Sequence, residues 1–535
     1  MHQCDLIDLI ATAVVGAGAS IPGPFGARPL LYADYTASGR ALDFVEARMA
    51  AIAAPFYANT HTETSYTGLQ TTRLREASRE AIRRAVGADA RHAVIFSGSG
   101  ATAAVNKLVG ALDLKRHDGK AVVFIGPYEH HSNDLPWREA GVRVVRIPLD
   151  ARGHICLETL AAELRRHADA PLRLGSFSAA SNVTGIKTDM RALGALLHAH
   201  GAWFLADYAA GGPYLAIDMA ESAPGRGDHC DAIFLSPHKF IGGPGASGVL
   251  VADKRLFAGA APSITGGGTV AYVTAARHRY VADIERREEA GTPNVLGDIR
   301  AGLVLQLKAD IGAEAIEAAE QRAVARAFAA WGANPDIEIL GSAEAERLAI
   351  FSFNIRSGGT LLHPNFVVAL LNDLFGIQAR GGCSCAGPYG HDLLKIGDDT
   401  AARYDALIAG GLGIFRPGWV RLSFNFFFSD ETIEALIAAV AFIARRGADF
   451  LPLYQVDAAS GRWLCGGQST PPRFAFADLC DWPASAPAEA PRCMDFSACL
   501  IEAERLADEA ASLPCPAHMA ALDDPARWFR LERAS

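Results

Sequence analysis

Lys239 stands shortly after an apolar run, Ile233–Leu235, which predicts the end of a buried strand, and Ser236, Pro237 and His238 lead into it. A lysine next to a core lies where burial disfavours its charged form, so it can act as a nucleophilic amine. Ser236 and His238 offer hydrogen-bond donors for an anion, and the glycines after the lysine let the backbone approach a bulky group. Taken alone, the stretch also fits a solvated lysine in a turn.

A second stretch, Trp203–Ala206, is an apolar run of strand length, and Asp207 stands at its C-terminal end. In an open parallel sheet, ligands bind where the strands end. Pyridoxal phosphate needs a lysine that forms a Schiff base with it and a carboxylate that keeps its pyridine nitrogen protonated. Asp207 alone is more simply a helix N-cap. Together with Lys239, it favours a site for this cofactor.

A glycine-rich turn lies further upstream in the chain. Gln70–Val86 predicts an amphipathic helix with a solvated face of Arg and Glu, and Ala93–Phe96 predicts the strand after it. The turn SGSG, Ser97–Gly100, then leads into a helix that begins near Ala101. Such a turn presents free backbone N–H groups and the positive end of the helix dipole to an anion. These turns are common, so the pattern carries little weight by itself.

Two cysteines, Cys383 and Cys385, lie in the glycine-containing loop ARGGCSCAGP. A free cysteine is mostly thiol at neutral pH, and a nearby cation raises the thiolate fraction. Arg380 is such a cation, close in sequence. The alternative is a structural or metal-binding C-x-C pair, although no further cysteines lie nearby.

The composition fits an enzyme with a sizeable core. The chain has 535 residues, half of them hydrophobic, and a net charge of -9 without a basic block. Nucleic acid and anionic membranes are therefore unexpected partners. The ten cysteines show no C-x-x-C spacing, and we find no signal peptide and no apolar run of about 18 residues. We expect a cytoplasmic protein without a membrane anchor, a disulfide framework or a bound metal.

The S-x-H-K motif at Ser236–Lys239, with glycines after the lysine, resembles the cofactor-lysine motif of class V aminotransferases, the group that includes cysteine desulfurases. The resemblance covers roughly residues 30–450. It implies the fold type I of pyridoxal-phosphate enzymes, an α/β fold with a large, mainly parallel sheet of the seven-stranded type and a smaller α+β domain. We expect a mobile or loosely packed arm at 1–29, the cofactor domain at 30–300, the smaller domain at 301–450 and an unexplained extension at 451–535.

The resemblance also implies a set of cofactor contacts. These residues are Ala101, Thr102, His130, Asn182, Asp207, Ser236, His238, Lys239 and Thr292. Ala101 and Thr102 would hold the phosphate, and Asn182 would hydrogen-bond the phenolic oxygen. His130 would stack on the pyridine ring and pass protons; the alternative for His130 and its neighbour is a metal pair.

One residue departs from the family pattern. Ala210 stands where the family usually has a glutamine that tunes the phenolic oxygen. Losing one neutral hydrogen bond costs roughly 1 kcal/mol, so we expect the cofactor to bind nonetheless.

The substrate side of the resemblance rests on three residues and the cysteine loop. Desulfurases carry their catalytic cysteine five positions after an arginine, which selects Cys385 after Arg380. Arg421, in a motif similar to the family's R-x-S, would hold the substrate carboxylate with a bidentate pair. His61 lies in a polar stretch that would reach toward the neighbouring subunit's site.

The resemblance thus implies a desulfurase that takes sulfur from L-cysteine as an enzyme persulfide and releases alanine. Lys239, Cys385 and His130 would be its catalytic residues. Its partners would be a second copy of the chain, with Thr292 shared between sites, and a sulfur-acceptor protein. An aminotransferase, epimerase or other lyase of the same class is the alternative, and a cofactor-binding regulator without catalysis is the third.

Overall fold

The computed structural model describes residues 3–60, 62–257, 259, 261–480, 495–514 and 522–532. The chain divides into two compact units. The first takes in the described parts of Met1–Val15, Tyr35–Glu320 and Gly341–Leu348, and the second those of Gly16–Asp34, Gln321–Leu340 and Ala349–Ser535. The domain boundary expected at residue 300 falls inside helix α9 (Val295–Ile311), which belongs to the first unit.

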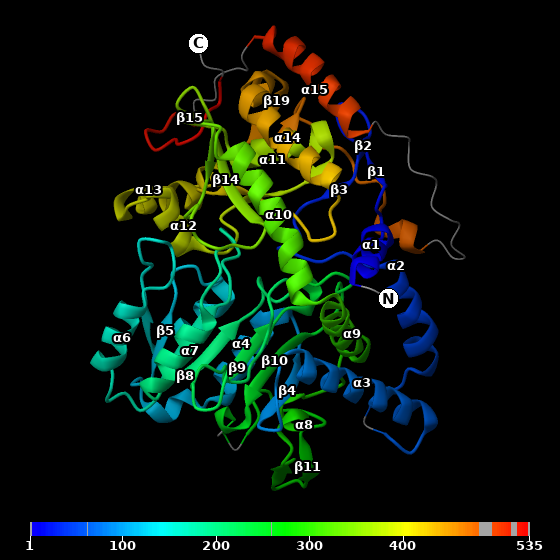
Figure 1. The fold of residues 1–535 in the computed structure, drawn as a ribbon, viewed down its shortest axis with the longest axis vertical. Coiled ribbons are helices and arrows are strands. Elements are labelled where there is room, and N and C mark those ends of the chain that lie inside the picture. Colours follow the sequence, from blue (N-terminus) through cyan, green and yellow to red (C-terminus); the bar gives the residue numbers. More distant parts are fainter. Residues whose placement is uncertain are drawn as a thin grey trace. The chain divides into compact units, whose positions relative to one another are not determined.

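The first unit is built on a seven-stranded sheet (Figure 1). Its strands, in sheet order, are β4 (His92–Ser97), β10 (Gly248–Asp253), β9 (Ala232–Leu235), β8 (Trp203–Asp207), β7 (Arg173–Ser178), β5 (Val122–Ile125) and β6 (Arg143–Arg146). β10 is antiparallel to both of its neighbours, and the other pairs are parallel. The mainly parallel sheet predicted from the sequence is confirmed.

The strand directions bring six strand ends to one edge of this sheet. Because β10 is antiparallel to both β4 and β9, β4 runs in the same direction as β9, β8, β7, β5 and β6. The register sets Ser178 opposite Asp207, and Asp207 opposite Phe234. The loops that follow these strands therefore share the carboxyl edge, where open α/β sheets bind ligands.

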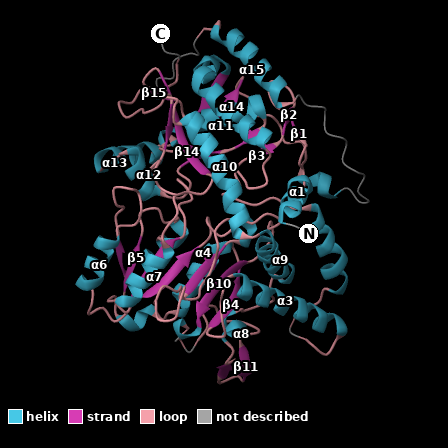
Figure 2. Cartoon of the chain, viewed as in Figure 1, coloured by secondary structure: helices cyan, strands magenta, loops and turns pink. Residues whose placement is uncertain are grey.

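Helices cover the sheet, so its central strands are buried on both faces and read as continuous apolar runs (Figure 2). α4 packs on β9 and β10, α7 on β8, and α3 on both β4 and α9. Besides α9, the helices of this unit are α1 (Gln3–Ala13), α2 (Asp43–Arg48), α3 (Tyr66–Ala85), α4 (Gly100–Ala111), α5 (Leu135–Glu139), α6 (Leu157–Arg166), α7 (Met190–Ala199) and α8 (Ile284–Glu288). A two-stranded hairpin, β11 (Val270–Val273) and β12 (His278–Tyr280), precedes α8.

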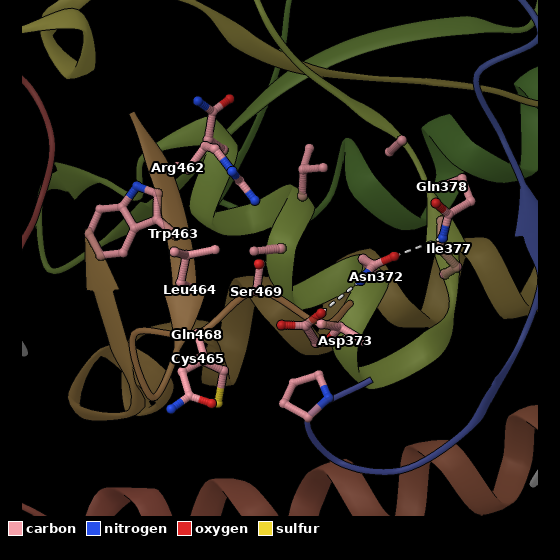
Figure 3. A pocket seen from close by; sticks show the side chains of 16 residues that line it. Asn372, Asp373, Ile377, Gln378, Arg462, Trp463, Leu464, Cys465, Gln468 and Ser469 are labelled. Carbon is pink, nitrogen blue, oxygen red and sulfur yellow. Dashed lines mark hydrogen bonds between the residues drawn. The ribbon is translucent and has the colours of Figure 1, made fainter. Parts of the chain in front are cut away.

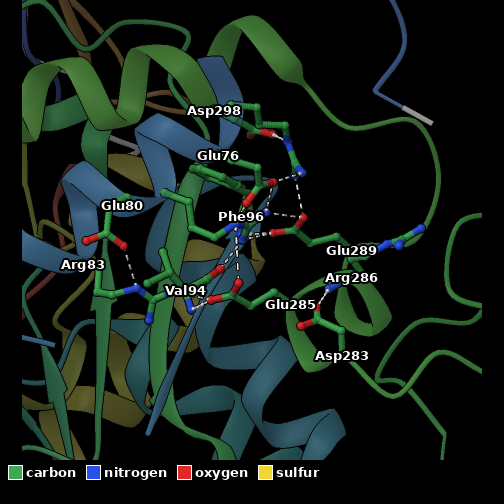
Figure 4. A network of polar contacts seen from close by, with 12 residues as sticks. Glu76, Glu80, Arg83, Val94, Phe96, Asp283, Glu285, Arg286, Glu289 and Asp298 are labelled. Atoms are coloured by element: carbon green, nitrogen blue, oxygen red, sulfur yellow. Dashed lines mark hydrogen bonds and ion pairs between the residues drawn. The ribbon is translucent and has the colours of Figure 1, made fainter. Parts of the chain in front are cut away.

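Carboxylates cover the open edge of the sheet at β4 (Figure 4). The backbone N–H of Val94 donates to Glu285 at 2.7 Å, and that of Phe96 donates to Glu289 at 2.7 Å. An uncovered edge strand would be a template for pairing with another chain. The segment around α8 therefore completes the sheet with side chains in place of a further strand.

Two arginines of α3 neutralise these carboxylates (Figure 4). Arg75 lies 2.5 Å from Glu289 and 2.7 Å from Asp298, and Arg79 lies 2.9 Å from Glu289. Both arginine side chains are buried, at 8% and 5% exposure. The prediction of a solvated charged face is therefore wrong for these two residues. The amphipathic pattern of one helix does not reveal that α8 and α9 cover its polar side.

The described part of the N-terminal segment is packed and not loose as the sequence predicted. In α1, Leu6 and Ile10 are buried, because the helix packs against α9. β1 (Ser20–Ile21) pairs with β2 (Arg28–Pro29), and the buried Arg28 donates to the Leu374 carbonyl at 2.8 Å.

The second unit contains a smaller antiparallel sheet. Its strands, in sheet order, are β13 (Ile337–Ile339), β14 (Ile350–Ser357), β18 (Trp419–Ser423) and β17 (Arg380–Gly382), and β15 (Thr360–Leu361) pairs with β14. β16 (Ile377–Gln378) pairs with β3 (Leu31–Tyr32). The helices are α11 (Pro364–Phe375), α12 (Gly387–Leu394), α13 (Asp398–Ala409), α14 (Asp430–Arg446) and α15 (Phe496–Ala511), and α10 (Ala313–Trp331) continues into this unit from the first.

The C-terminal extension belongs to this second unit. It forms the hairpin β19 (Tyr454–Asp457) and β20 (Arg462–Cys465), followed later by α15. Cys499, Leu522 and Phe529 are buried in the same apolar core as the residues of α11 and α14. Among the helices of the described chain, none combines the length and apolar character that a membrane span requires.

Candidate functional site

Lys239 and Asp207 come together at the carboxyl edge of the large sheet. Lys239 ends a single 3-10 turn, Pro237–Lys239, that directly follows β9, and Asp207 is the last residue of the neighbouring β8. The Asp207 carboxylate is buried and accepts a hydrogen bond from the Ala209 N–H at 2.8 Å. Burial raises the pKa of Asp207, while the nearby charge of Lys239 lowers it. The carboxylate therefore binds a backbone N–H of the loop that follows β8 and does not cap a helix.

The glycine-rich turn packs directly on the segment that carries the lysine. The Ala101 N–H donates to Ser236 Oγ at 2.9 Å. Gly100 has φ +58°, and a Cβ there would lie 2.7 Å from the His238 ring and 2.8 Å from Ser236 Oγ, so only glycine fits. The positive end of α4 thus begins beside Ser236 and His238, as an anion site requires.

His130 is tied to the same region through two hydroxyl groups. Its Nδ1 accepts the Ser132 N–H at 3.1 Å and lies 3.0 Å from Ser132 Oγ. Ser132 Oγ in turn lies 2.6 Å from Thr102 Oγ1, on the first turn of α4. This chain of contacts fixes the histidine ring relative to the turn.

Glu129 is a buried carboxyl group to which the sequence analysis assigned no role. It accepts hydrogen bonds from Ser178 N at 3.1 Å, Ser178 Oγ at 2.6 Å and Asn133 Nδ2 at 2.7 Å. Burial raises its pKa to about 7, and the charge of Asp207 adds to the shift. A second carboxyl group therefore shares the environment of Asp207 and holds the loop that bears His130.

The remaining predicted residues of the first unit are spread over several loops. Asn182 is buried in the turn after β7, and Thr292 is exposed in the turn between α8 and α9. The Gly39 N–H donates to the His238 carbonyl at 2.9 Å, so the loop around Gly39 contacts the segment that carries Lys239. His61 lies outside the described residues.

The second unit brings together the arginines predicted for the substrate. Arg380 on β17 stands opposite Arg421 on β18. Arg421 is buried and forms an ion pair with Asp34 at 2.8 Å. Burial lowers the pKa of Arg421, Asp34 opposes the shift, and the nearby groups Arg380 and Cys385 act in opposite directions. Asp34, which the sequence did not point to, already forms an ion pair with part of this guanidinium group.

The cysteine loop has a strained backbone. Ser384 and Cys385 have φ of 53° and 58°, in the left-handed region that residues other than glycine seldom adopt. Such strain persists only where the surrounding structure enforces it, and it clusters at functional sites. Cys385 therefore sits in a defined conformation near Arg421.

A cavity of about 430 Å³ lies in the second unit between α11 and the β19–β20 hairpin (Figure 3). Its wall includes Asp373, which accepts hydrogen bonds from Tyr454 Oη and Asn372 Nδ2, both at 2.7 Å. Ala379, next to Arg380, also lines it. The C-terminal extension and the residue that precedes β17, the strand leading to the cysteine loop, therefore line the same cavity.

The groups at the edge of the large sheet fit pyridoxal phosphate. A lysine amine and a buried carboxylate stand at neighbouring strand ends. A glycine cradle at a helix N-terminus faces a serine and a histidine. These groups match the aldehyde, the pyridine nitrogen and the phosphate of that molecule in turn.

Comparisons with known proteins point to a family of pyridoxal-phosphate enzymes. The family model for aminotransferase class V matches residues 31–436. A cysteine desulfurase of Synechococcus elongatus is 28% identical over 420 residues, which cover 77% of this chain and 60% of that relative, so the match spans less than two thirds of its length. A cysteine desulfurase of Klebsiella pneumoniae is 28% identical over 417 residues, which cover 77% of this chain and 93% of the relative.

The solved structures show the same fold. The apo structure of a cysteine desulfurase from Thermococcus onnurineus NA1 has a TM-score of 0.65 at 24% identity, and the superposition covers 78% of this chain and 95% of that one. The family match extends over most of the chain and includes Lys239, Asp207 and the cysteine loop. The chain therefore belongs to the class V aminotransferase family.

Proposed function

We propose that this protein is a pyridoxal-phosphate-dependent cysteine desulfurase that removes sulfur from L-cysteine and leaves alanine. The observation that carries the proposal is Lys239 beside Asp207 at adjacent strand ends, in a chain that also holds Cys385 near two arginines. Relatives named cysteine desulfurases support it.

Bound pyridoxal phosphate would supply an electron-poor ring that stabilises negative charge next to the substrate nitrogen. Lys239 would attach the cofactor and, once released, move protons as a free amine. Asp207 would hold the pyridine nitrogen protonated, and His130 would stack on the ring. Burial and Lys239 lower the pKa of His238 to about 4, so His238 would act as a neutral donor.

The other cofactor contacts are assigned by position. Ser236, Ala101 and Thr102 would bind the phosphate at the start of α4, which the packing of Gly100 on Ser236 supports. Asn182 would donate to the phenolic oxygen from the turn after β7. Thr292 would reach the phosphate of a second subunit, because it is exposed on a turn.

The substrate residues act through charge. Arg421, with Arg380 next to it, would bind the carboxylate of cysteine, and His61 would line the same site. Cys385 lies near Arg421. Its thiolate would form a bond to the substrate sulfur as the bond from sulfur to Cβ breaks. Cβ takes a proton to give alanine, and Cys385 keeps the sulfur as a persulfide.

We further propose a homodimer with shared sites, which transfers the persulfide sulfur to an acceptor protein. A second candidate function is that of a transaminase, epimerase or other lyase that uses the same cofactor. Ala210 favours it, because the residue that usually tunes the phenolic oxygen is replaced.

Product analysis tests the proposed function. The purified protein is incubated with L-cysteine, L-alanine and L-aspartate, each with and without a keto acid acceptor. With dithiothreitol present to reduce the persulfide, we expect alanine and sulfide in equal amounts from L-cysteine without a keto acid, and no product from Lys239→Ala. Keto acids from the amino acids, with no alanine from cysteine, would replace the proposal with a transaminase.

A further inference from the structure

A cluster of His198, His229 and Asp231 lies in the first unit, outside the site described above. His198 is on α7, His229 is in the loop before β9, and Asp231 immediately precedes β9. The cluster is therefore at the opposite end of β9 from Lys239. We call these three residues the imidazole–carboxylate cluster.

The two imidazoles face the same carboxylate. His198 Nε2 lies 2.8 Å from Asp231 Oδ2, and His229 Nε2 lies 3.5 Å from Asp231 Oδ1. The rings are stacked, with centroids 4.0 Å apart and an angle of 18° between planes. One ligand atom from each of the three residues lies within 4.8 Å of the others.

The outer nitrogens of both rings face oxygen atoms. His198 Nδ1 lies 2.5 Å from the Gly227 carbonyl, and His229 Nδ1 lies 3.7 Å from a Glu221 oxygen. His198 thus has the arrangement of a metal-ligating histidine, whose other ring N–H donates to a carbonyl and leaves Nε2 for the ion, whereas His229 Nδ1 makes no hydrogen bond with the described residues.

The backbone around the cluster is held in place. Gly194 of α7 packs so closely on the loop that a Cβ there would lie 2.9 Å from the His229 carbonyl oxygen. Gly227 has φ +65°, a conformation that side chains disfavour. Asp231 also accepts the Phe204 N–H of β8 at 2.7 Å. The three ligands are thus presented by packed elements of the sheet layer.

The local charge favours a cation. Asp231 is a carboxylate whose two oxygens face the two imidazoles. Glu221 and Asp228 add negative charge, and Arg191 lies between Asp228 and Asp218 at 3.8 Å and 2.8 Å.

We propose that His198, His229 and Asp231 bind a divalent transition-metal ion of the zinc class. Two imidazoles and one carboxylate suit Zn²⁺, Co²⁺ or Ni²⁺, whereas Mg²⁺ and Ca²⁺ prefer oxygen ligands. The rings must open from their stack so that both Nε2 atoms converge on the ion at about 2.0–2.1 Å. The ion joins α7 to the starts of β8 and β9, so its role is structural.

Cobalt titration of the full-length protein tests this proposal. After treatment with EDTA and dialysis, we expect one Co²⁺ per chain, visible absorption of a four-coordinate site without a thiolate band, and a higher Tm. His198→Gln and His229→Gln should weaken Co²⁺ binding by about tenfold or more. The control is His167→Gln, which removes an imidazole 3.7 Å from Glu163 and should leave binding unchanged.

A second measurement does not depend on the variants folding. Carbethoxylation of the wild-type protein, mapped by mass spectrometry, should be suppressed at His198 and His229 by Zn²⁺ but not at His167. The proposal is overturned if no Co²⁺ binds, if binding is unchanged in both cluster variants, or if Zn²⁺ gives no protection.

Discussion

Glu129 and Asp207 are two buried carboxyl groups at one edge of a sheet, and their surroundings give them different roles. Asp207 faces Lys239, whose charge favours the ionised form. Glu129 receives three hydrogen bonds from Ser178 and Asn133 but faces no cation among these contacts, and its pKa rises to about 7. Burial raises the pKa of both groups, the charge of Lys239 opposes this shift only at Asp207, and Glu129 carries a proton at moderately acid pH.

Glu129→Gln tests this assignment through the pH dependence of stability. Unfolded glutamate titrates near pH 4.3, as an approximate value, and native Glu129 near 7. The native state thus binds the proton more tightly, and this contribution to stability is lost as pH rises from about 4 to about 7. Gln imitates the protonated acid, so the variant does not lose this stability as pH rises. Its free energy of unfolding in urea, relative to that of the wild type, should therefore increase by on the order of 3 kcal/mol from pH 4 to pH 8. A constant difference between the two proteins would refute the raised pKa.

Lys239→Ala tests the cofactor lysine. Borohydride reduction of the wild-type protein should place a pyridoxyl group on the Lys239 peptide, and the variant should lose both this group and the visible absorption. Lys254→Ala, which removes an exposed lysine after β10, is the matched control and should keep both. A pyridoxyl group on any other lysine would rule out the assignment.

The sequence predicts that Lys239 and Asp207 lie at one edge of the sheet, because Asp207 ends one apolar strand, Lys239 follows shortly after the next, and parallel strands end at the same edge. It does not reveal Glu129 as a buried acid, since the donors of Glu129 come from β7 and from the turn after His130. It also misses the ion pair of Arg421 with Asp34, which joins residues 387 positions apart.

At the scale of elements, the segment around α8 covers the edge strand β4, and α3 neutralises the carboxylates of that segment. Glu289 is buried, and although burial opposes its charge, Arg79 and Arg75 keep its pKa below the usual value. The sequence shows the arginines of α3 but not the layer over them, because no local pattern links residue 79 to residue 289. Tertiary packing, and not helical periodicity, decides whether these charges are solvated.

Glu289→Gln should therefore destabilise the protein. It leaves two buried arginines with less compensation, which costs about 3 kcal/mol, measured by urea unfolding. Glu76→Gln changes a carboxylate of the same network whose side chain is 51% exposed, and it should cost less than about 1 kcal/mol. Equal losses in the two variants would contradict a buried network at the sheet edge.

At the scale of the whole molecule, the chain joins a cofactor unit to a second unit that holds the cysteine loop and the C-terminal extension. The alternating strand, turn and helix signals predict the main strands of the first unit but not its boundaries. The extension is not predicted, because its Pro- and Ala-rich stretches show no sustained periodicity. Its buried residues, such as Phe529, find their partners in α11 and neighbouring elements of the second unit.

The shared-site hypothesis predicts an obligate dimer. Thr292 is exposed in this chain, and under this hypothesis it would contact the phosphate of a second copy. Sedimentation should give twice the chain mass, and Thr292→Ala should weaken cofactor retention without changing the mass. A monomer that is fully active at the assay concentration would exclude shared sites.

Mapping the persulfide tests the central claim most directly. The protein is given one equivalent of L-cysteine, alkylated and analysed by mass spectrometry, alongside Cys385→Ser and Cys383→Ser. We predict the extra sulfur on Cys385 in the wild type and in Cys383→Ser. Cys385→Ser should keep the visible absorption of the cofactor but form neither persulfide nor alanine. Sulfur on Cys383 with Cys385 dispensable would move the catalytic cysteine, and undiminished alanine formation in the absence of both cysteines would contradict the desulfurase mechanism itself.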